Sequence, residues 1–395
     1  MNFVVQNRIA TTSARVRAAA RAVSRRAAER AGALDRDGGF PGEDVVHCHE
    51  AGLLAAPLPV ALGGADLDTP AMAPVLLDVL AHVGRGSLAL GRLYEGHVNA
   101  LSLILRFASD PVRDRLAADV RAGHLFGVWN TQPQDGGLVL AGEGDACRLA
   151  GVKSFASGAG SVTRPLVTAR RPDGRQQMLV IDLAPGTRAD LSSWCAQGMR
   201  ASTSGILDFS GLPVGLGAAV GEADDYFREP HFSGGAWRFA AVQLGGIEAV
   251  FDVLRAHLGA TGRGSDPHQA ARLGEAAIAV ETARLFVSHA AALASDPDAE
   301  PDRVIAYVNL ARLAVERAGL DVLERAQRSV GLAGFLQTHP LERLSRDLAT
   351  YLRQPGPDRA LTHAAAYVLA DARPAEALWH DPDDTLVPQH PVHAS

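Results

Sequence analysis

The feature that most constrains the fold is a change of texture in the middle of the chain. From about residue 125 to 228, short apolar runs alternate with turns, as in the stretches GLVLAGEG, RPLVTA and SGILDFSGLPV. Runs of this length, bounded by Gly, Pro, Asn and Asp, are typical of strands. The step RRPDGRQQ between LVTA and MLVIDL predicts a hairpin, because Asp-Gly tolerates the positive φ that tight turns need. The block is therefore predicted to be an all-β unit.

Two helical blocks flank this unit. Residues 12–124 have helical spacing of apolar positions, and the same texture returns from about 232 to 373 in long, alanine-rich segments with broad apolar faces. Such helices usually pack in a bundle or against another subunit. We therefore predict an α+β fold with a helical N-terminal domain, a central β-barrel-like domain, a C-terminal four-helix bundle and a flexible tail, at residues 1–124, 125–230, 231–374 and 375–395.

Composition and charge narrow the classes of function. The formal net charge of −6 gives no basic footprint for a nucleic acid, and we see no run of about 18 uncharged apolar residues to span a membrane. The N-terminus scatters arginines among alanines, so a secretory signal is not expected. Three distant cysteines, Cys48, Cys147 and Cys195, favour a reducing compartment over a disulfide framework. We expect a cytoplasmic protein with neither nucleic acid nor membrane as partner.

Two short motifs imitate ligand sites. HCHE, from His47 to Glu50, lies in a predicted helix, where residues two apart point to different sides. The two histidines cannot easily share one ion, so no metal site is expected. GEGDAC contains G-x-G, but it lies between two predicted strands and does not open a helix. A hairpin turn is therefore the better interpretation than a dinucleotide site.

The order of the pieces, with several short motifs, resembles the acyl-CoA dehydrogenase family over about residues 35–370. GGFPGEDVVHCHEAGLLAAPLPVALGG is similar to the family's N-terminal helix with its Gly-Leu end and Pro…Gly-Gly turn. NTQP stands where the family has Val-Thr-Glu-Pro, and LAGVKSFASGAG where it has Asn-Gly-x-Lys-x-(Trp/Phe)-Ile-(Thr/Ser). MRASTSGILDFSGLPV resembles a strand pair of the family, and GFLQTHPLERLSRD its Gly-Phe…Pro…Arg-Asp stretch. The resemblance implies the family's fold and an FAD-dependent oxidoreductase.

The resemblance also implies where the flavin ring would lie. A ring buried between sheet and bundle needs hydrogen-bond donors and an aromatic wall. By their places in the motifs, Asn130 and Thr131 would approach the pyrimidine edge, Ser157 would lie near N5, and Phe155 would be the aromatic wall. The alternative is that these are ordinary strand and turn residues.

The adenine half of FAD is matched less closely. The family uses an Arg followed by a Gln on one helix, and a Gln with Gly-Gly on the neighbouring subunit. Arg263 and Gln269 stand at a shorter spacing than usual, and Gln327 precedes Gly331 with the glutamine one place out of register. A solvated arginine and a helix-end glycine are the alternative. The apolar faces of the C-terminal helices favour a homodimer or homotetramer.

The family's catalytic base is replaced in this sequence. In most members a glutamate after an Arg-Asp pair takes the α-proton of an acyl thioester, while the β-hydrogen leaves as hydride to the flavin. Counting from Arg346 and Asp347, this position is Pro355. Other members carry the base on the first long helix of the bundle, where this chain has Trp237 before Arg238. Neither proline nor tryptophan can take a proton in this way.

Three hypotheses follow, because a general base typically contributes 10²–10⁴-fold. The protein is a dehydrogenase with a relocated base, for which Asp358 is the nearest carboxylate; a flavin-dependent monooxygenase of the same fold, in which His97 stands where that branch often has a histidine facing the flavin; or a non-catalytic relative that keeps the scaffold. Gly137 replaces the family's serine that meets the thioester ligand. The expected substrate is therefore an acyl thioester or another small organic molecule.

Overall fold

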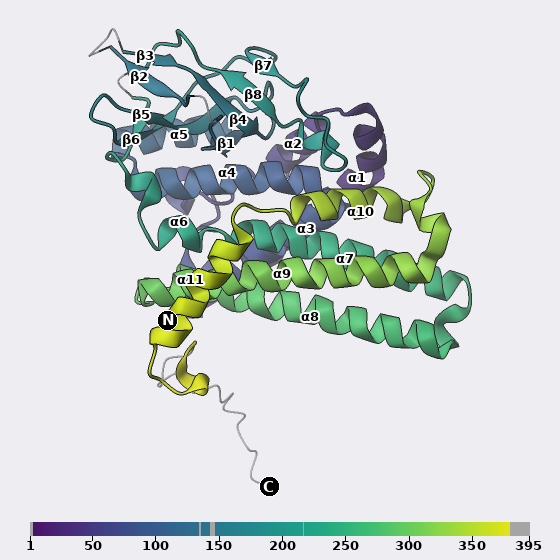
Figure 1. Cartoon of the computed structure of the whole chain (residues 1–395). Helices are drawn as coiled ribbons and strands as arrows, with labels where there is room; N and C mark the ends of the chain where they lie inside the picture. Colours follow the sequence, from purple (N-terminus) through teal and green to yellow (C-terminus); the bar gives the residue numbers. More distant parts are fainter. Residues whose placement is uncertain (1–2, 134–135, 143–146, 216, 380–395) are drawn as a thin grey trace.

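The computed structural model describes residues 3–133, 136–142, 147–215 and 217–379, and it has three parts in chain order (Figure 1). The first part is helical. Ser87 is the N-cap of its central helix, and the Ser87 side chain accepts from the backbone N–H of Leu90 at 3.3 Å. The helices are α1 (Phe3–Asp37), α2 (Gly42–Glu50), α3 (Ala73–Gly86), α4 (Leu88–Phe107) and α5 (Asp110–Arg121).

The second part consists of two sheets. The six-stranded sheet has β5 at its centre, paired in parallel with β1 and β2 and antiparallel with β6, and the three-stranded sheet has the order β4-β8-β7. Leu166 lies opposite Val180 across the β5–β6 hairpin, which confirms the hairpin predicted at Asp173-Gly174. The strands are β1 (Phe126–Trp129), β2 (Val139–Ala141), β3 (Arg148–Ala150), β4 (Val152–Ala156), β5 (Arg164–Arg170), β6 (Gln176–Val180), β7 (Ala189–Asp190), β8 (Gly205–Asp208) and β9 (Ala219–Val220).

The G-x-G motif joins two paired strands, as its hairpin interpretation requires. Strands β2 and β3 are antiparallel, with Val139 opposite Ala150. Residues 143–146 of the turn itself lie outside the described residues.

The third part is a helical bundle. Two of its long helices, α8 and α9, begin at prolines in the first turn, and the carboxylates of Asp266 and Glu300 cap the backbone N–H groups that these helix starts leave free. Helices α7, α8 and α9 pack on one another, and α11 packs on α9. The helices are α6 (His231–Gly234), α7 (Trp237–Ala260), α8 (Pro267–Ser295), α9 (Pro301–Val330), α10 (Pro340–Tyr351) and α11 (Pro357–Ala370).

The N-terminal helices join the sheets to the bundle. Helix α4 packs on β1, and α3 packs on α7 (Figure 1). The second contact brings two backbones together: a Cβ added to Gly245 on α7 would stand 1.9 Å from the carbonyl oxygen of Ala81 on α3. Any side chain there would force the helices apart, so this glycine fixes the position of α7 relative to the rest of the fold.

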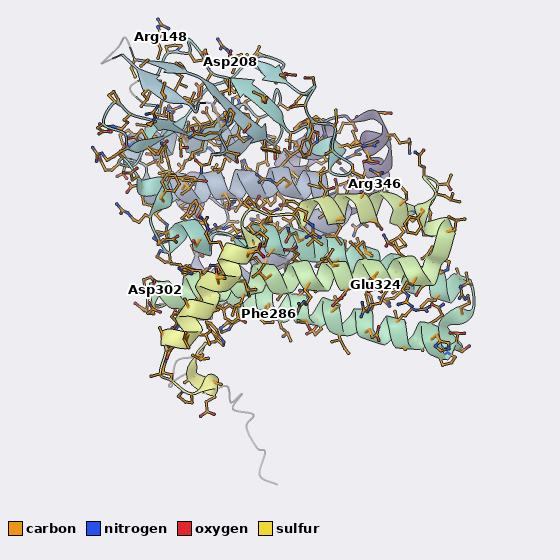
Figure 2. All side chains as sticks on the ribbon, viewed as in Figure 1. Arg148, Asp208, Phe286, Asp302, Glu324 and Arg346 are labelled. Carbon is orange, nitrogen blue, oxygen red and sulfur yellow. The ribbon has the colours of Figure 1, made fainter. Side chains whose placement is uncertain are left out.

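The Arg-Asp pair of α10 ties all three parts together. Arg346, labelled in Figure 2, donates to the Asp35 carboxylate of α1 at 2.6 Å and to the Gln197 carbonyl of the sheet domain at 2.8 Å. The neighbouring Asp347 accepts from the backbone N–H of Met199 at 2.6 Å. The pair is therefore an interdomain link, and it fixes the start of the segment that follows α10.

The predicted order of a helical domain, a sheet domain and a second helical domain is confirmed. The flexible tail was predicted from residue 375, and its first residues contradict this. A short 3-10 turn (Ala375–Ala377) leads to Trp379, whose ring lies 5.2 Å from that of Tyr307 and 5.7 Å from that of Tyr367. Aromatic packing anchors this part of the tail, and residues 380–395 lie outside the described residues.

One helix, α8, is long and apolar enough to cross a membrane by length and composition alone. The sequence reading did not anticipate this. The helix packs against α7 and α9. A single helix of this kind is weak evidence for a membrane span, because the core helices of soluble proteins pass the same test.

Candidate active site

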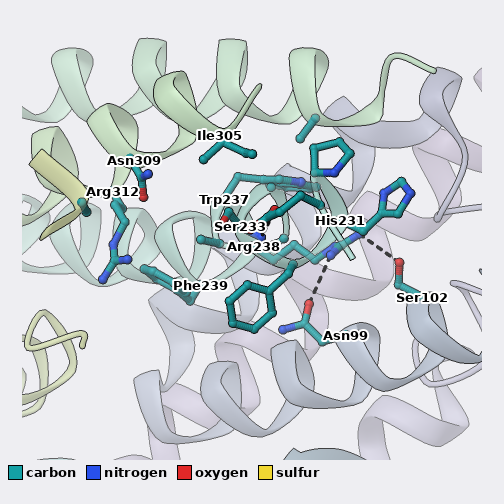
Figure 3. A pocket seen from close by; sticks show the side chains of 18 of the residues that line it. Asn99, Ser102, His231, Ser233, Trp237, Arg238, Phe239, Ile305, Asn309 and Arg312 are labelled. Carbon is teal, nitrogen blue, oxygen red and sulfur yellow. Dashed lines mark hydrogen bonds between the residues drawn. The ribbon is translucent and has the colours of Figure 1, made fainter. Parts of the chain in front are cut away.

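A cavity of about 730 Å³ lies where the three parts meet. Its walls come from α4, the segment Glu229–Ala236, the first turn of α7, one face of α9 and the start of α11, with Val128 of β1 at one side (Figure 3). This volume is in the range of small-molecule sites, which often form at domain junctions.

Both residues that replace the expected base line this cavity. Trp237 opens α7 and is 2% exposed, and Pro355 lies in the turn between α10 and α11. The structure therefore brings the two replaced positions to one cavity, as the resemblance implied. The indole and the pyrrolidine ring offer no proton acceptor there.

Arg238 holds the α4 side of the cavity. Its guanidinium donates to Ser102 Oγ at 3.1 Å and to Asn99 Oδ1 at 3.3 Å (Figure 3), and it lies 3.4 Å from the Asp68 carboxylate. Burial raises the pKa of Asp68, although Arg238 lowers it. The Nε of Arg238 is buried without a partner among the described residues. This arginine is a buried cation with hydrogen-bonding capacity left over.

Arg312 of α9 holds the opposite end. It donates to the carbonyl oxygen of Pro355 at 2.7 Å, and its guanidinium lies over the Phe239 ring at 5.5 Å. Arg359 of α11 lines the same end. Sequence reasoning missed both, because Arg312 is 43 residues away from the turn it supports and no local motif marks it.

Glu95 of α4 is a buried carboxylate in the cavity wall that sequence reasoning also missed. It is 3% exposed, pairs with Arg92 at 2.6 Å, and accepts a second hydrogen bond from Asn99. The Arg-x-x-Glu spacing of Arg92 and Glu95 was visible in the sequence, but on a helix it usually marks a solvated pair. Because both oxygens are engaged, Glu95 is poorly suited to act as a general base.

Asp358, the predicted relocated base, is exposed and does not line the cavity. Its neighbours on α11, Gly356, Arg359, Ala360 and His363, do. They follow the spacing of one helix face, and Asp358 falls off that face. The structure therefore contradicts a catalytic role for Asp358 in this cavity.

His97, the predicted monooxygenase histidine, is fully buried away from the cavity. Its Nδ1 accepts from the N–H of Phe126 at 3.1 Å, so the proton is on Nε2, which donates to the Leu54 carbonyl at 2.8 Å. Burial lowers the pKa of His97 to about 4. With both nitrogens engaged it joins α4, β1 and the segment after α2, so its predicted catalytic role is wrong.

The residues predicted near the flavin ring come together at the ends of two strands. Asn130 and Thr131 follow β1, and Phe155 and Ser157 lie at the end of β4; we call these four the β-domain wall. The Thr131 carbonyl accepts from the N–H of Ser154 at 3.1 Å, and the Ser157 carbonyl accepts from the indole of Trp129 at 3.0 Å. Phe155 is 69% exposed at a φ of +50°.

A buried lysine holds this wall. Lys153, the only lysine of the chain, is inaccessible to solvent and donates to the Asn130 carbonyl and to Thr168 Oγ1, each at 3.1 Å. Thr168 in turn donates to Asn130 Oδ1 at 2.5 Å. Burial lowers the pKa of Lys153 to about 8. This network fixes the backbone and side chain of Asn130.

The four residues predicted at the adenine half gather at one end of the bundle. With its amide oriented to satisfy both ends, Gln269 donates to Ser329 Oγ at 2.8 Å and accepts from Arg263 at 2.7 Å and Arg272 at 3.1 Å. The Gly331 N–H donates to the Gln327 carbonyl, with Gly331 at a φ of +72°.

At Gly137, the family's serine position, the Gln132 side chain occupies the space of the missing side chain. A Cβ added there would stand 1.3 Å from Oε1 of Gln132, so the Gln132 side chain fills this space. In the described part of the chain, no cluster of three or more His, Cys, Asp or Glu side chains could hold a metal ion.

Comparison with known proteins agrees with this geometry. The acyl-CoA dehydrogenase N-terminal domain family matches residues 11–124, and the C-terminal domain family matches residues 226–367. The putative acyl-CoA dehydrogenase YdbM of Bacillus subtilis (strain 168) is 25% identical over 353 residues, covering 84% of this chain and 90% of that protein. The amino sugar nitrososynthase DnmZ of Streptomyces peucetius is 25% identical over 344 residues, covering 80% and 82%.

Solved structures share the fold. FMN-bound TdsC from Paenibacillus sp. A11-2 superposes with a TM-score of 0.80 at 19% identity, covering 93% of this chain and all of that chain. The three-part fold with its junction cavity thus defines a class of oxidoreductases that includes flavin-binding members. The two family matches together span more than half of the chain, so the chain belongs to the acyl-CoA dehydrogenase family.

The β-domain wall suits the flavin that this family implies. Phe155 presents a mostly exposed aromatic ring two residues before Ser157, whose hydroxyl accepts from the Ser204 hydroxyl at 3.2 Å. A flat aromatic cofactor could cover the Phe155 ring and form hydrogen bonds with the Ser157 hydroxyl and with the residues at the ends of β1 and β4. The cofactor would supply the redox chemistry, and these residues would bind and orient it.

Proposed function

We propose that the protein is an FAD-dependent oxidoreductase that acts on a small organic molecule without removing an α-proton, as a flavin-dependent monooxygenase of the acyl-CoA dehydrogenase fold. One observation carries this proposal: Trp237 and Pro355 occupy both base positions and both line the cavity. Oxygen insertion does not require an α-proton to be taken from the substrate.

Two candidate carboxylates, Glu95 and Asp358, do not substitute for the missing base. The Glu95 carboxylate is committed to Arg92 and Asn99, and Asp358 does not line the cavity. A dehydrogenase without a base would lose about 10²–10⁴-fold in rate. Gly137 also lacks the serine hydroxyl that meets the thioester ligand in the family, which further argues against a CoA thioester as substrate.

FAD rather than FMN is proposed because of the basic cluster at the bundle end. Arg263 and Arg272 converge on Gln269, and neither has an ion-pair partner within 4 Å in the part of the chain that the structure describes. Two free guanidinium groups suit the diphosphate of FAD. Extraction of the bound flavin and chromatography against FMN and FAD standards tests this.

We also propose a homodimer or homotetramer, in which a second copy covers α8 and presents the basic cluster. Ile278 and Leu285 on α8 are 70% and 60% exposed, and Leu369 on α11 is 88% exposed. Exposed large apolar side chains on long helices are typical of an interface between subunits. A monomer at micromolar concentration in light scattering would contradict the proposal.

A cytoplasmic location is proposed as well, because the three cysteines are free and burial raises the pKa of the Cys48 thiol. Recovery of the protein in the soluble fraction after cell lysis would support it, and recovery in an extracellular fraction would contradict it.

The absorbance spectrum of the purified protein is the first test, because a non-catalytic relative should be colourless and should not take up FAD. If flavin is bound, anaerobic mixing with saturated acyl-CoA esters of several lengths should leave it oxidised. Rapid bleaching would contradict the proposal. After chemical reduction, the protein should consume oxygen, and a failure to do so would exclude the monooxygenase.

A further inference from the structure

Among the side chains that line the cavity, positively charged groups outnumber negatively charged ones. Four arginines line it, against three carboxylates. Among the described residues, no ion pair within 4 Å joins any of these arginines to any of these carboxylates. The arginines are Arg106, Arg238, Arg312 and Arg359, and the carboxylates are Glu95, Glu229 and Asp302.

The deepest carboxylate and one at the rim are already engaged elsewhere. Glu95 pairs with Arg92, which does not line the cavity. Glu229 accepts from the N–H of Ser233 at 3.0 Å and from its hydroxyl at 2.6 Å. Arg238 pairs with Asp68 outside the cavity lining. The other three arginines of the cavity have no ion-pair partner within 4 Å among the described residues.

Two of the arginines meet on the turn between α10 and α11. Arg312 donates to the carbonyl of Pro355, and Nε of Arg359 lies 3.9 Å from the point where a Cβ on Gly356 would stand. We call Arg312 and Arg359 the arginine pair. Arg312 is half-buried, and burial, with Arg359 adding to the effect, lowers its pKa although Glu316 raises it.

Most N–H donors of the arginine pair have no hydrogen-bond acceptor among the described residues. Arg312 donates to the Pro355 carbonyl. In the described part of the chain, neither arginine has an ion-pair partner within 4 Å. A guanidinium has five N–H donors and keeps its proton in proteins. Two such groups held together repel each other unless an anion lies between them.

The location of the pair gives this observation its meaning. Pro355 stands where most members of the family have a carboxylate, so this end of the cavity has the opposite charge here. Phe239 lies against Arg312, and Ile305 lines the same cavity further along α9. A charged end and an apolar side describe an amphipathic ligand.

We propose that the arginine pair binds the carboxylate of a small organic acid, whose apolar part lies against Phe239 and Ile305. This rests on the proposed function only in placing the substrate in this cavity. The planar fork of Arg312 supplies two parallel N–H donors to the carboxylate, and Arg359 supplies a second charge from the α11 side.

The test uses binding, which does not depend on turnover. Benzoate, benzamide and inorganic phosphate are titrated into the purified protein by calorimetry. Benzoate should bind at least about tenfold more tightly than the isosteric but neutral benzamide, because charge-assisted hydrogen bonds are the stronger ones. Equal binding of the two would overturn the proposal. Phosphate binding as tight as that of benzoate would overturn the assignment to an organic acid.

Variants locate the site. Arg312→Gln should weaken benzoate binding about tenfold or more and leave benzamide binding unchanged, and Arg312→Lys should restore part of the loss, because it keeps the charge without the fork. If Arg312→Gln does not fold, Arg359→Gln on the exposed α11 surface gives the same test with a smaller loss, about threefold. Unchanged benzoate binding in these variants would overturn the proposal.

The matched control is Arg353→Gln. Arg353 lies next to the same turn, but it pairs with Glu316 at 2.7 Å and does not line the cavity. Benzoate binding should be unchanged in this variant, and an equal loss would show a general charge effect and overturn the proposal. A protein that binds benzoate but consumes no oxygen after reduction contradicts only the proposed function, whereas the reverse result contradicts only the arginine pair.

Discussion

Two sides of the candidate site differ in how their cations are bonded. In the β-domain wall, Lys153 donates to Asn130 and Thr168, and the threonine passes a hydrogen bond back to the asparagine. At the other end of the cavity, Arg312 donates to the Pro355 carbonyl and has no ion-pair partner within 4 Å among the described residues. Lys153 has the partners it needs within the chain, whereas the arginine pair has donors left over.

This difference separates residues that hold the fold from residues that can bind a ligand. A buried polar group that is satisfied internally fixes the backbone around it. A cation with free donors in a cavity is available to an anion from outside. The β-domain wall keeps the residue types that the family resemblance implied, and the arginine pair lies where the family's chemistry is replaced. Under the proposed function, the β-domain wall is the cofactor side and the arginine pair the substrate side.

The strongest challenge to this distinction is His97, which we assign to the structural group. His97→Ala should lower the free energy of unfolding by about 3 kcal/mol, because it leaves the Leu54 carbonyl and the Phe126 N–H without partners and creates a cavity. Urea denaturation at pH 7 measures this. Benzoate binding should change less than twofold, and a selective loss of binding or turnover in a stable variant would contradict the assignment.

The pH dependence of the same variant gives an independent check. The folded-state pKa of His97, about 4, lies below its ordinary value near 6.5. Between these values the unfolded chain binds a proton that the folded chain does not, so wild-type stability is lost as the pH falls from 6.5 towards 4, by up to about 3 kcal/mol. His97→Ala should lack this part of the loss. His363→Ala, at an exposed position on α11, is the control and should behave as wild type.

Lys153 tests the internally satisfied side with a smaller effect. Its folded-state pKa of about 8 lies below the ordinary value of 10.5. Between pH 8 and 10.5 the unfolded chain binds a proton that the folded chain does not, so wild type should gain stability relative to Lys153→Met as the pH rises, by about 1 kcal/mol from pH 8 to 9.5. Below pH 8 both states are protonated and the difference is constant.

Because the chain has a single lysine, this titration can be followed directly. Selective isotope labelling of lysine gives one side-chain resonance, whose midpoint should lie near pH 8. A midpoint near 10.5 would mean that Lys153 is solvated and that the wall is not held in the way described here.

The sequence was sufficient to predict the fold, because local patterns determine it, whereas the cofactor role of the β-domain wall stays a prediction. The change of texture separates the sheet domain from the helices, and the motifs around Asn130 and Ser157 mark the ends of β1 and β4. Pro355 and Trp237 were recognised as replaced base positions by counting from neighbouring motifs, and the structure brings both to the cavity.

The interior of the cavity could not be predicted, because it depends on contacts between distant segments. Arg312 reaches a turn 43 residues away, and the sequence gives no sign of that contact. On α11 the sequence did contain a signal: Gly356, Arg359, Ala360 and His363 share one face, and Asp358 does not. Choosing the carboxylate nearest in sequence ignored this periodicity. His97 was misassigned because a buried histidine with two internal partners looks the same in sequence as a catalytic one.

The smallest expected effect on stability belongs to Phe155, which sharpens the comparison from the cofactor side. Its ring is 69% exposed and its φ is +50°, where a side chain is strained. Phe155→Ala should therefore change the free energy of unfolding by no more than about 0.5 kcal/mol. The same variant should bind flavin several-fold more weakly, because aromatic contacts of this kind are worth about 0.5–1.5 kcal/mol. Flavin binding is followed by quenching of flavin fluorescence, and unfolding by urea.

Leu332→Ala, an 81% exposed position at the end of the bundle, controls for the loss of an exposed apolar side chain and should leave flavin binding unchanged. A drop of more than 1 kcal/mol in unfolding free energy would make Phe155 a structural residue like His97. Unchanged flavin affinity would place the ring elsewhere, and the β-domain wall would then hold the fold without holding the cofactor.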